Sequence, residues 1–229
     1  MDRVVRFVVI AVLFVPLGLW GRDIRVSGDI SALQAAINGA QPGDVILIAP
    51  GVYEGNIKIE GKRDLTLRGD FTIIPPSEEI CCGAAIPERV ATVVIKGTLF
   101  ILHSINILVE NITVTGPGSG FFIQGTTVSP AKSIVIRHVA AIRNAKHGVE
   151  IVGNATDIYI FCSSLSYNGY DGVFLDDFAS SVTIEACEIS YNGQISATGV
   201  GIRIGAHAKN IVIKANCIVG NAFAGVHPQ

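Results

Sequence analysis

The feature that most constrains this chain is a repeat that keeps its register through the second half of the sequence. Each unit begins with two aliphatic residues that flank a variable one, and these triplets start at Ile134, Ile158, Val182 and Ile211. The starts are 24, 24 and 29 residues apart, and the longer interval contains an insertion at residues 194–198. Later in every unit come an asparagine and then a glycine with an aliphatic neighbour; these landmarks are Asn144, Asn168, Asn192 and Asn221, and Gly148, Gly172, Gly201 and Gly225.

A repeat of this length, built on short alternating stretches, is typical of a parallel β-helix in which each turn of chain stacks on the next. Neighbouring turns then lie about 4.8 Å apart. Alternation sends every second side chain into the core, so the repeat predicts three stacked aliphatic columns. Their members are Ile134, Ile158, Val182 and Ile211; Val149, Val173 and Ile202; and Ala141, Leu165, Ile189 and Ile218.

The asparagines recur at one corner of the predicted turns. Asparagine tolerates the left-handed backbone conformation that a tight bend requires. Stacked side-chain amides can also bond to one another and form a ladder. We therefore interpret Asn144, Asn168, Asn192 and Asn221 as structural residues.

The first third of the chain divides into a leader and a capping segment. Residues 1–21 combine Arg3 and Arg6 with an apolar stretch, which predicts a signal peptide or, if uncleaved, a membrane anchor through residues 1–20. Residues 28–39 are predicted to form a helix with Ser31 as its N-cap and Gln34 in the capping-box position. Its apolar face would close the open end of the stack.

We expect residues 22–229 to form one domain, an all-β single-stranded right-handed parallel β-helix with this N-terminal capping helix. Residues 69–93 break the pattern with Pro75, Pro76 and Pro87 and are predicted to form an irregular excursion from the stack. The C-terminal end is predicted to be uncapped or truncated, and end-to-end association there is one expectation for partners.

Two segments resemble a known family. Residues 32–59, ALQAAINGAQPGDVILIAPGVYEGNIKI, look like the opening of the pectin-lyase-like β-helix superfamily. Residues 164–193, SLSYNGYDGVFLDDFASSVTIEACEISYNG, are similar to the repeats of NosD-type and carbohydrate-active β-helix proteins. The resemblance implies the fold. It leaves activity open, because the superfamily contains lyases, hydrolases, epimerases and proteins without enzymatic activity.

Candidate catalytic residues are His147, Asp171, Asp176 and Arg203. His147 and Asp171 hold equivalent positions in neighbouring units, so they should be adjacent rungs, and a histidine beside a carboxylate can act as a general base. In an enzyme acting on an acidic polysaccharide, Arg203 would neutralise a uronate carboxylate, His147 would take the proton and Asp171 would orient the imidazole. The alternative is a surface ion pair at a corner.

A second group of residues suggests a sugar-binding surface. Glu150, Phe174, Arg203 and His227 share one outward position of successive units. Aromatic rings stack on the apolar faces of sugars while charged groups bond to their hydroxyls. The candidate substrate-binding residues are Tyr159, Phe161, Tyr170, Phe174 and Asp177, with the 194–198 insertion beside them. The alternative is ordinary cross-strand stacking of rings.

Composition excludes several classes of function. The net charge is −2 and no basic stripe is visible, which argues against nucleic acid as a partner. The His, Asp and Glu residues show no metal-ligand spacing and the cofactor is unknown. Five cysteines do not form a disulfide framework, and Cys162, Cys187 and Cys217 are predicted to be buried thiols.

Three functions remain open from the sequence. The first is an exported module that binds polysaccharide or a cell-surface glycan, or acts as an envelope protein, through one lateral face. The second is a polysaccharide-active enzyme: a lyase, C5-epimerase or glycoside hydrolase. The third is a structural spacer. Each is compatible with export to the periplasm, cell surface or medium.

Overall fold

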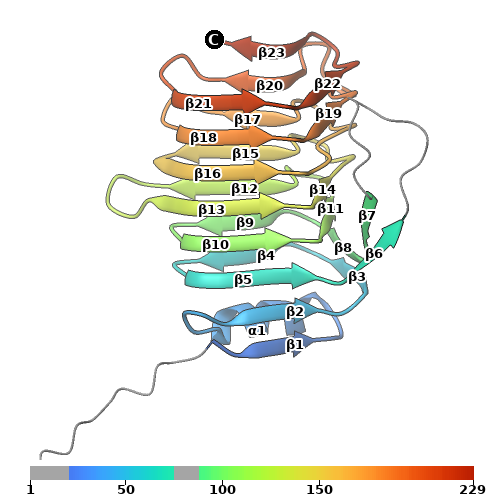
Figure 1. The fold of residues 1–229 in the computed structure, drawn as a ribbon, viewed down its shortest axis with the longest axis vertical. Helices are drawn as coiled ribbons and strands as arrows, with labels where there is room; N and C mark the ends of the chain where they lie inside the picture. Colours follow the sequence, from blue (N-terminus) through green and yellow to red (C-terminus); the bar gives the residue numbers. More distant parts are fainter. Residues whose placement is uncertain (1–20, 75–87) are drawn as a thin grey trace, which may run out of the picture.

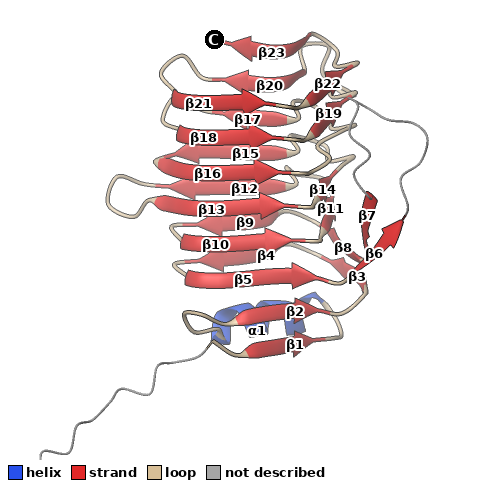
Figure 2. Ribbon diagram, viewed as in Figure 1, coloured by secondary structure: helices blue, strands red, loops and turns tan. Residues whose placement is uncertain are grey.

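The computed structural model describes residues 21–74 and 88–229, which form a coil of stacked turns with three parallel faces (Figures 1 and 2). Every strand pair within these faces is parallel and joins consecutive turns. The predicted all-β parallel β-helix is thus confirmed. In Figure 1 the eight-stranded sheet faces the viewer, the seven-stranded sheet lies behind it, and the short strands of the third face lie at the right.

The eight-stranded sheet contains β1 (Asp23–Val26), β2 (Val45–Ile48), β5 (Arg63–Gly69), β10 (Ile105–Glu110), β13 (Ala131–Arg137), β16 (Ala155–Phe161), β18 (Ser180–Glu185) and β21 (Lys209–Lys214). The seven-stranded sheet contains β4 (Ile57–Glu60), β9 (Leu99–Leu102), β12 (Phe121–Gly125), β15 (Val149–Gly153), β17 (Val173–Leu175), β20 (Val200–Ile204) and β23 (Ala224–Pro228). The third face contains β3 (Gly51–Glu54), β8 (Val93–Lys96), β11 (Thr113–Thr115), β14 (Ala140–Ala141), β19 (Glu188–Ser190) and β22 (Cys217–Val219).

The predicted core columns are confirmed by the strand register. Ile134 pairs with Ile158, and the column continues through Val182 to Ile211. Val149, Val173 and Ile202 form the second column. In the third, Ile189 pairs with Ile218, and the β-bridges at Ser164 align the preceding turns. Nearly all of these side chains are fully buried, and only those of the last turn, Ile211 and Ile218, are partly exposed.

The asparagine ladder is also confirmed. The Nδ2 of Asn144 donates to the Oδ1 of Asn168 at 3.0 Å, and the same contact links Asn168 to Asn192 and Asn192 to Asn221, each at 2.9 Å. The predicted left-handed backbone at these residues is wrong. Positive φ angles occur at the residues just before them, Arg143 (53°), Tyr167 (60°), Tyr191 (54°) and Gly220 (63°).

The glycine landmark has a separate cause, the close approach of neighbouring turns. A Cβ atom on Gly172 would lie 2.7 Å from the carbonyl oxygen of Gly201 and 2.4 Å from Cγ2 of Ile189. On Gly148 it would lie 2.6 Å from the carbonyl oxygen of Gly172. Since such distances are shorter than side-chain atoms tolerate, this corner accepts only glycine.

Helix α1 (Ile30–Gly39) closes the N-terminal end with Leu33 and Ile37 fully buried. The predicted caps are wrong: Asp29 is the N-cap, accepting from the Ala32 amide at 3.0 Å, and Ser31 donates to Asp29. Gln34 instead bonds to both backbone groups of Lys58 in β4, each at 2.8 Å. It therefore pairs the edge strand of the seven-stranded sheet, which would otherwise be open.

Between β5 and β8 the chain leaves the three faces. Strands β6 (Phe71–Ile74) and β7 (Glu88–Ala91) pair antiparallel with each other. Residues 1–20 and 75–87 lie outside the described residues, so the leader, the membrane anchor and part of the 69–93 excursion stay predictions. Among the described residues, no helix has the length and apolar character needed to cross a membrane.

The cysteine predictions hold only in part. Cys187 is a buried thiol whose pKa burial raises to about 12. Cys217 is disulfide-bonded, so a thiol at this position is wrong. Cys81 and Cys82 lie outside the described residues.

Candidate functional site

One outward column crosses the seven-stranded sheet from end to end. The predicted alignment of Glu150, Phe174, Arg203 and His227 is confirmed by the pairing of β15, β17, β20 and β23. The register extends the column in the other direction to Phe122 and Phe100, whose rings lie 5.6 Å apart. We call the surface around this column, with the corner residues that precede its strands, the lateral surface.

Phe100 and Phe122 were not among the residues predicted from the sequence. Both belong to stretches of alternating apolar residues, and that alternation is the signal that could have found them. Phe122 lies 28 residues before Glu150, whereas Phe174 lies 24 residues after it. The unequal spacing hides the upper half of the column from a search for a fixed period.

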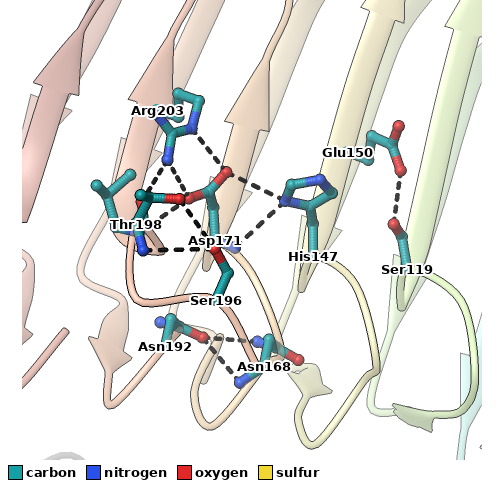
Figure 3. A network of polar contacts seen from close by, with 10 residues as sticks. Ser119, His147, Glu150, Asn168, Asp171, Asn192, Ser196, Thr198 and Arg203 are labelled. Carbon is teal, nitrogen blue, oxygen red and sulfur yellow. Dashed lines mark hydrogen bonds and ion pairs between the residues drawn. The ribbon is translucent and has the colours of Figure 1, made fainter. Parts of the chain in front are cut away.

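Three predicted catalytic residues meet at the corner before β17 (Figure 3). Asp171 binds Arg203 through two hydrogen bonds, from Nε to Oδ2 at 2.9 Å and from Nη2 to Oδ1 at 3.0 Å. His147 Nδ1 lies 3.2 Å from Asp171 Oδ2. The network also takes in the insertion loop, since Arg203 Nη2 donates to the carbonyl oxygen of Thr198 at 2.6 Å and the Val200 amide donates to Asp171 Oδ1 at 2.8 Å.

Asp171 is almost fully buried, with 2% of its side chain exposed. Burial by itself would raise the pKa of its carboxyl group. The hydrogen bonds from His147, Arg203 and the Val200 amide outweigh that effect and lower the pKa below its ordinary value. Asp171 is therefore a carboxylate that holds other groups in place, and it has no proton to give.

His147 is the member of this network that faces the surface. Its ring packs against Phe174 at 5.0 Å and Tyr170 at 5.7 Å between centroids. Nδ1 faces both the carboxylate and the backbone amide of Asp171, so that side of the ring is engaged within the protein. The imidazole is thus fixed in orientation by two ring contacts and one carboxylate.

Glu150 stands one rung from Phe122 and one rung from Phe174. The hydroxyl of Ser119, which is 3% exposed, donates to Glu150 Oε2 at 2.6 Å, as Figure 3 shows. This bond uses one carboxylate oxygen and fixes the side chain against the sheet.

Asp176 and Asp177 lie at the other end of β17, away from this corner. Asp176 accepts hydrogen bonds from the backbone amides of Phe178, Ala179 and Gly153, at 2.9, 3.1 and 2.6 Å. These bonds shape a turn. Asp177 pairs with the exposed His207 at 3.4 Å, which lowers the pKa of the Asp177 carboxyl group. The structure does not bring either aspartate to the His147–Asp171–Arg203 network.

Tyr159 and Phe161 belong to β16 of the eight-stranded sheet and so lie on a different face from Phe174. Their rings stack at 5.6 Å, and the Tyr159 hydroxyl donates to Glu185 at 2.6 Å. That bond, followed in importance by burial, raises the pKa of Tyr159 to about 12. Of the five predicted substrate-binding residues, the lateral surface contains Phe174 and Tyr170.

The described part of the chain contains no group of three or more His, Cys, Asp or Glu side chains arranged to hold a metal ion. The lateral surface therefore offers aromatic faces, one fixed imidazole and carboxylates. These are groups that recognise polyhydroxylated or charged ligands by stacking and hydrogen bonding.

Comparison with solved structures places the fold among known β-helix enzymes. An alginate lyase from Paenibacillus sp. str. FPU-7 matches with a TM-score of 0.59 and 16% identity over 85% of this chain. The pectate lyase Pel9A matches with a TM-score of 0.50 and 14% identity over 87% of this chain. The chain spans 65% and 64% of the lengths of these two proteins.

No curated protein sequence matches the chain. A family model described as "Right handed beta helix region" matches residues 93–228, which is more than half of the sequence, so the chain belongs to the right-handed β-helix family.

Proposed function

We propose that the protein binds carbohydrate through the lateral surface of its seven-stranded sheet. The observation that carries this proposal is the column in which Phe122, Glu150 and Phe174 occupy three successive rungs. Rings two rungs apart are separated by about 10 Å along the stack. A sugar chain laid along the stack can place its apolar faces on both rings while its hydroxyls reach the polar groups between them. The structural likeness to an alginate lyase and a pectate lyase supports a carbohydrate ligand.

Binding is favoured over catalysis by the way the network is occupied. Asp171 accepts from Arg203, His147 and a backbone amide, and Arg203 Nε and Nη2 are both used within the protein. A catalytic arginine must present its donors to the charge that develops on the substrate. Here two of its three nitrogens hold Asp171 and the insertion loop instead.

The experiment is retention on a panel of immobilised polysaccharides, with product analysis of the supernatant. Phe174→Ala should weaken retention about tenfold, because it removes a stacking ring and also releases His147. Phe161→Ala is the matched control, since it removes an outward ring of the same size from the other face. Equal retention of the two variants, or no retention on any polysaccharide, would contradict the proposal.

A second candidate, a polysaccharide lyase or epimerase, is favoured by the His147–Asp171 contact. With Nδ1 held by Asp171, Nε2 is the nitrogen that could remove a proton from a bound sugar. The test is whether incubation with polyuronates produces unsaturated ends, seen as ultraviolet absorbance, and whether His147→Gln stops it. Retention without any turnover favours the binding module.

We also propose that the protein is exported through residues 1–21. The charged and apolar pattern of this segment supports export. Expression of the full chain, fractionation and N-terminal sequencing of the product test the proposal. Accumulation of a chain with an intact leader in the cytosol would reject it.

A further inference from the structure

Glu150 is the charge on the lateral surface that the protein does not neutralise. Asp171 is paired with Arg203, and that pair has no net charge. Within residues 21–74 and 88–229, no ion pair involves Glu150, and its hydrogen bond comes from a neutral hydroxyl, that of Ser119. The surface at this point is therefore negative.

The carboxylate of Glu150 lies between two aromatic rings. Phe122 precedes it by one rung and Phe174 follows it by one rung, so each ring stands about 4.8 Å along the stack from the glutamate backbone. Aromatic faces attract cations through the ring quadrupole, and a carboxylate attracts them directly. Two rings on either side of one acid form a site with the chemistry that recognises an amine bound to a ring-shaped body.

We infer that the ligand of this surface is a sugar polymer that carries protonated amino groups, a polyglucosamine class of chain. This inference rests on the proposed carbohydrate binding and specifies its ligand. The ammonium group bonds to the free oxygen of Glu150, and the pyranose faces of the same or adjacent units stack on Phe122 and Phe174.

The same geometry disfavours a polyuronate at this position. A uronate carboxylate placed between the two rings would face Glu150, and like charges at such separation repel. The nearest guanidinium on the column, Arg203, lies two rungs away from Glu150 and is already paired with Asp171. A neutral sugar would stack on the rings but would gain nothing from the carboxylate charge.

The ligands to compare are oligomers of glucosamine, oligomers of N-acetylglucosamine of equal length, and oligogalacturonate. Binding is measured by calorimetry in mildly acidic buffer, where the amine is protonated. Glu150→Gln keeps the size and hydrogen-bonding capacity of the side chain and removes its charge. Glu188→Gln, on the exposed third face, is the matched control.

We expect wild-type protein to prefer the glucosamine oligomer, and Glu150→Gln to weaken that binding about threefold to tenfold while leaving the N-acetylated oligomer unchanged. Added salt should weaken the glucosamine complex alone, because salt screens the charge pair. Glu188→Gln should behave as wild type.

Three outcomes overturn the inference. Equal binding of the glucosamine and N-acetylglucosamine oligomers, an unchanged preference in Glu150→Gln, or a preference for oligogalacturonate each removes the role of the charge, yet each leaves carbohydrate binding standing. Failure to bind any of these oligomers and any polysaccharide of the panel overturns the proposed function together with the inference. Thermal melting of each variant excludes misfolding as the cause of a loss.

Discussion

Replacement of Asn168 by alanine should remove the central rung of the asparagine ladder. Its Oδ1 accepts from the backbone amide and Nδ2 of Asn144 at 3.1 and 3.0 Å, and its Nδ2 donates to Ala141 O and Asn192 Oδ1 at 3.1 and 2.9 Å. A buried hydrogen bond contributes about 1 kcal/mol net, and a buried donor left without a partner costs about 1–3 kcal/mol. Asn168 is 0% exposed, so we expect Asn168→Ala to lower the free energy of unfolding by about 3–5 kcal/mol.

Asn221 provides the matched control at the edge of the stack. It makes three bonds of the same kind, accepting from the amide and Nδ2 of Asn192 and donating to Ile189 O. Asn221 is only half-buried, so water can replace the lost side chain. Asn221→Ala should therefore lower the free energy of unfolding by about 1 kcal/mol.

Urea unfolding followed by far-ultraviolet circular dichroism measures both changes. For a slope of roughly 2–3 kcal/mol per molar urea, Asn168→Ala should move the midpoint down by about 1–2.5 M. Hydrogen exchange gives a local reading, because the Asn144 amide loses its acceptor in Asn168→Ala and keeps it in Asn221→Ala. Similar losses in the two variants, or a loss below about 1 kcal/mol in Asn168→Ala, would refute the assignment of the ladder as a main source of stability.

Three further predictions concern packing and ionisation. Gly172→Ala should destabilise the fold strongly in thermal melting, whereas Gly225→Ala, whose Cβ would approach no closer than 3.4 Å, should be tolerated; equal effects would reject the close-approach explanation. Asp171 has a lowered pKa, so its contribution to stability is present above the unfolded pKa of about 3.9 and is lost as the pH falls below it. Asp171→Asn should therefore flatten the acid side of the stability profile, and an unchanged slope between wild type and variant would contradict this. Tyr159 should ionise only near pH 12, so the ultraviolet titration of wild type minus Tyr159→Phe should show a late step, and a step near pH 10 would show that the bond to Glu185 does not form in solution.

The sequence predicted the core columns and the outward column because both depend on register alone. A period that holds at Ile134, Ile158 and Val182 fixes which residues become vertical neighbours, and strict alternation fixes which point inward. The same reasoning correctly placed His147 beside Asp171.

The sequence did not show which residues of one turn share a face. Tyr159 and Phe174 belong to the same unit but to different sheets, because the chain bends between them. Two of these bends use positive φ at Cys162 and Tyr167, residue types that do not signal a left-handed conformation. The partner of Arg203 was equally hidden, since a long side chain can reach several neighbours and only the folded corner decides between them.

The Asp171–Arg203 pair also explains how the stack keeps its register across an insertion. The 194–198 residues lengthen the loop before β20, and a longer loop gives the next strand freedom to shift. Arg203, from β20 itself, reaches back to Thr198 O and to Asp171, while Asp171 accepts from the Val200 amide at the start of the same strand. Removing either partner would leave a nearly buried charge uncompensated, which typically costs about 3–5 kcal/mol. Because the pair fixes both the loop and the orientation of His147, the lateral surface is rigid before any ligand arrives, and a preorganised surface loses less entropy on binding. The same bonds that withdraw Asp171 and Arg203 from acid–base chemistry therefore strengthen the surface as a binding site.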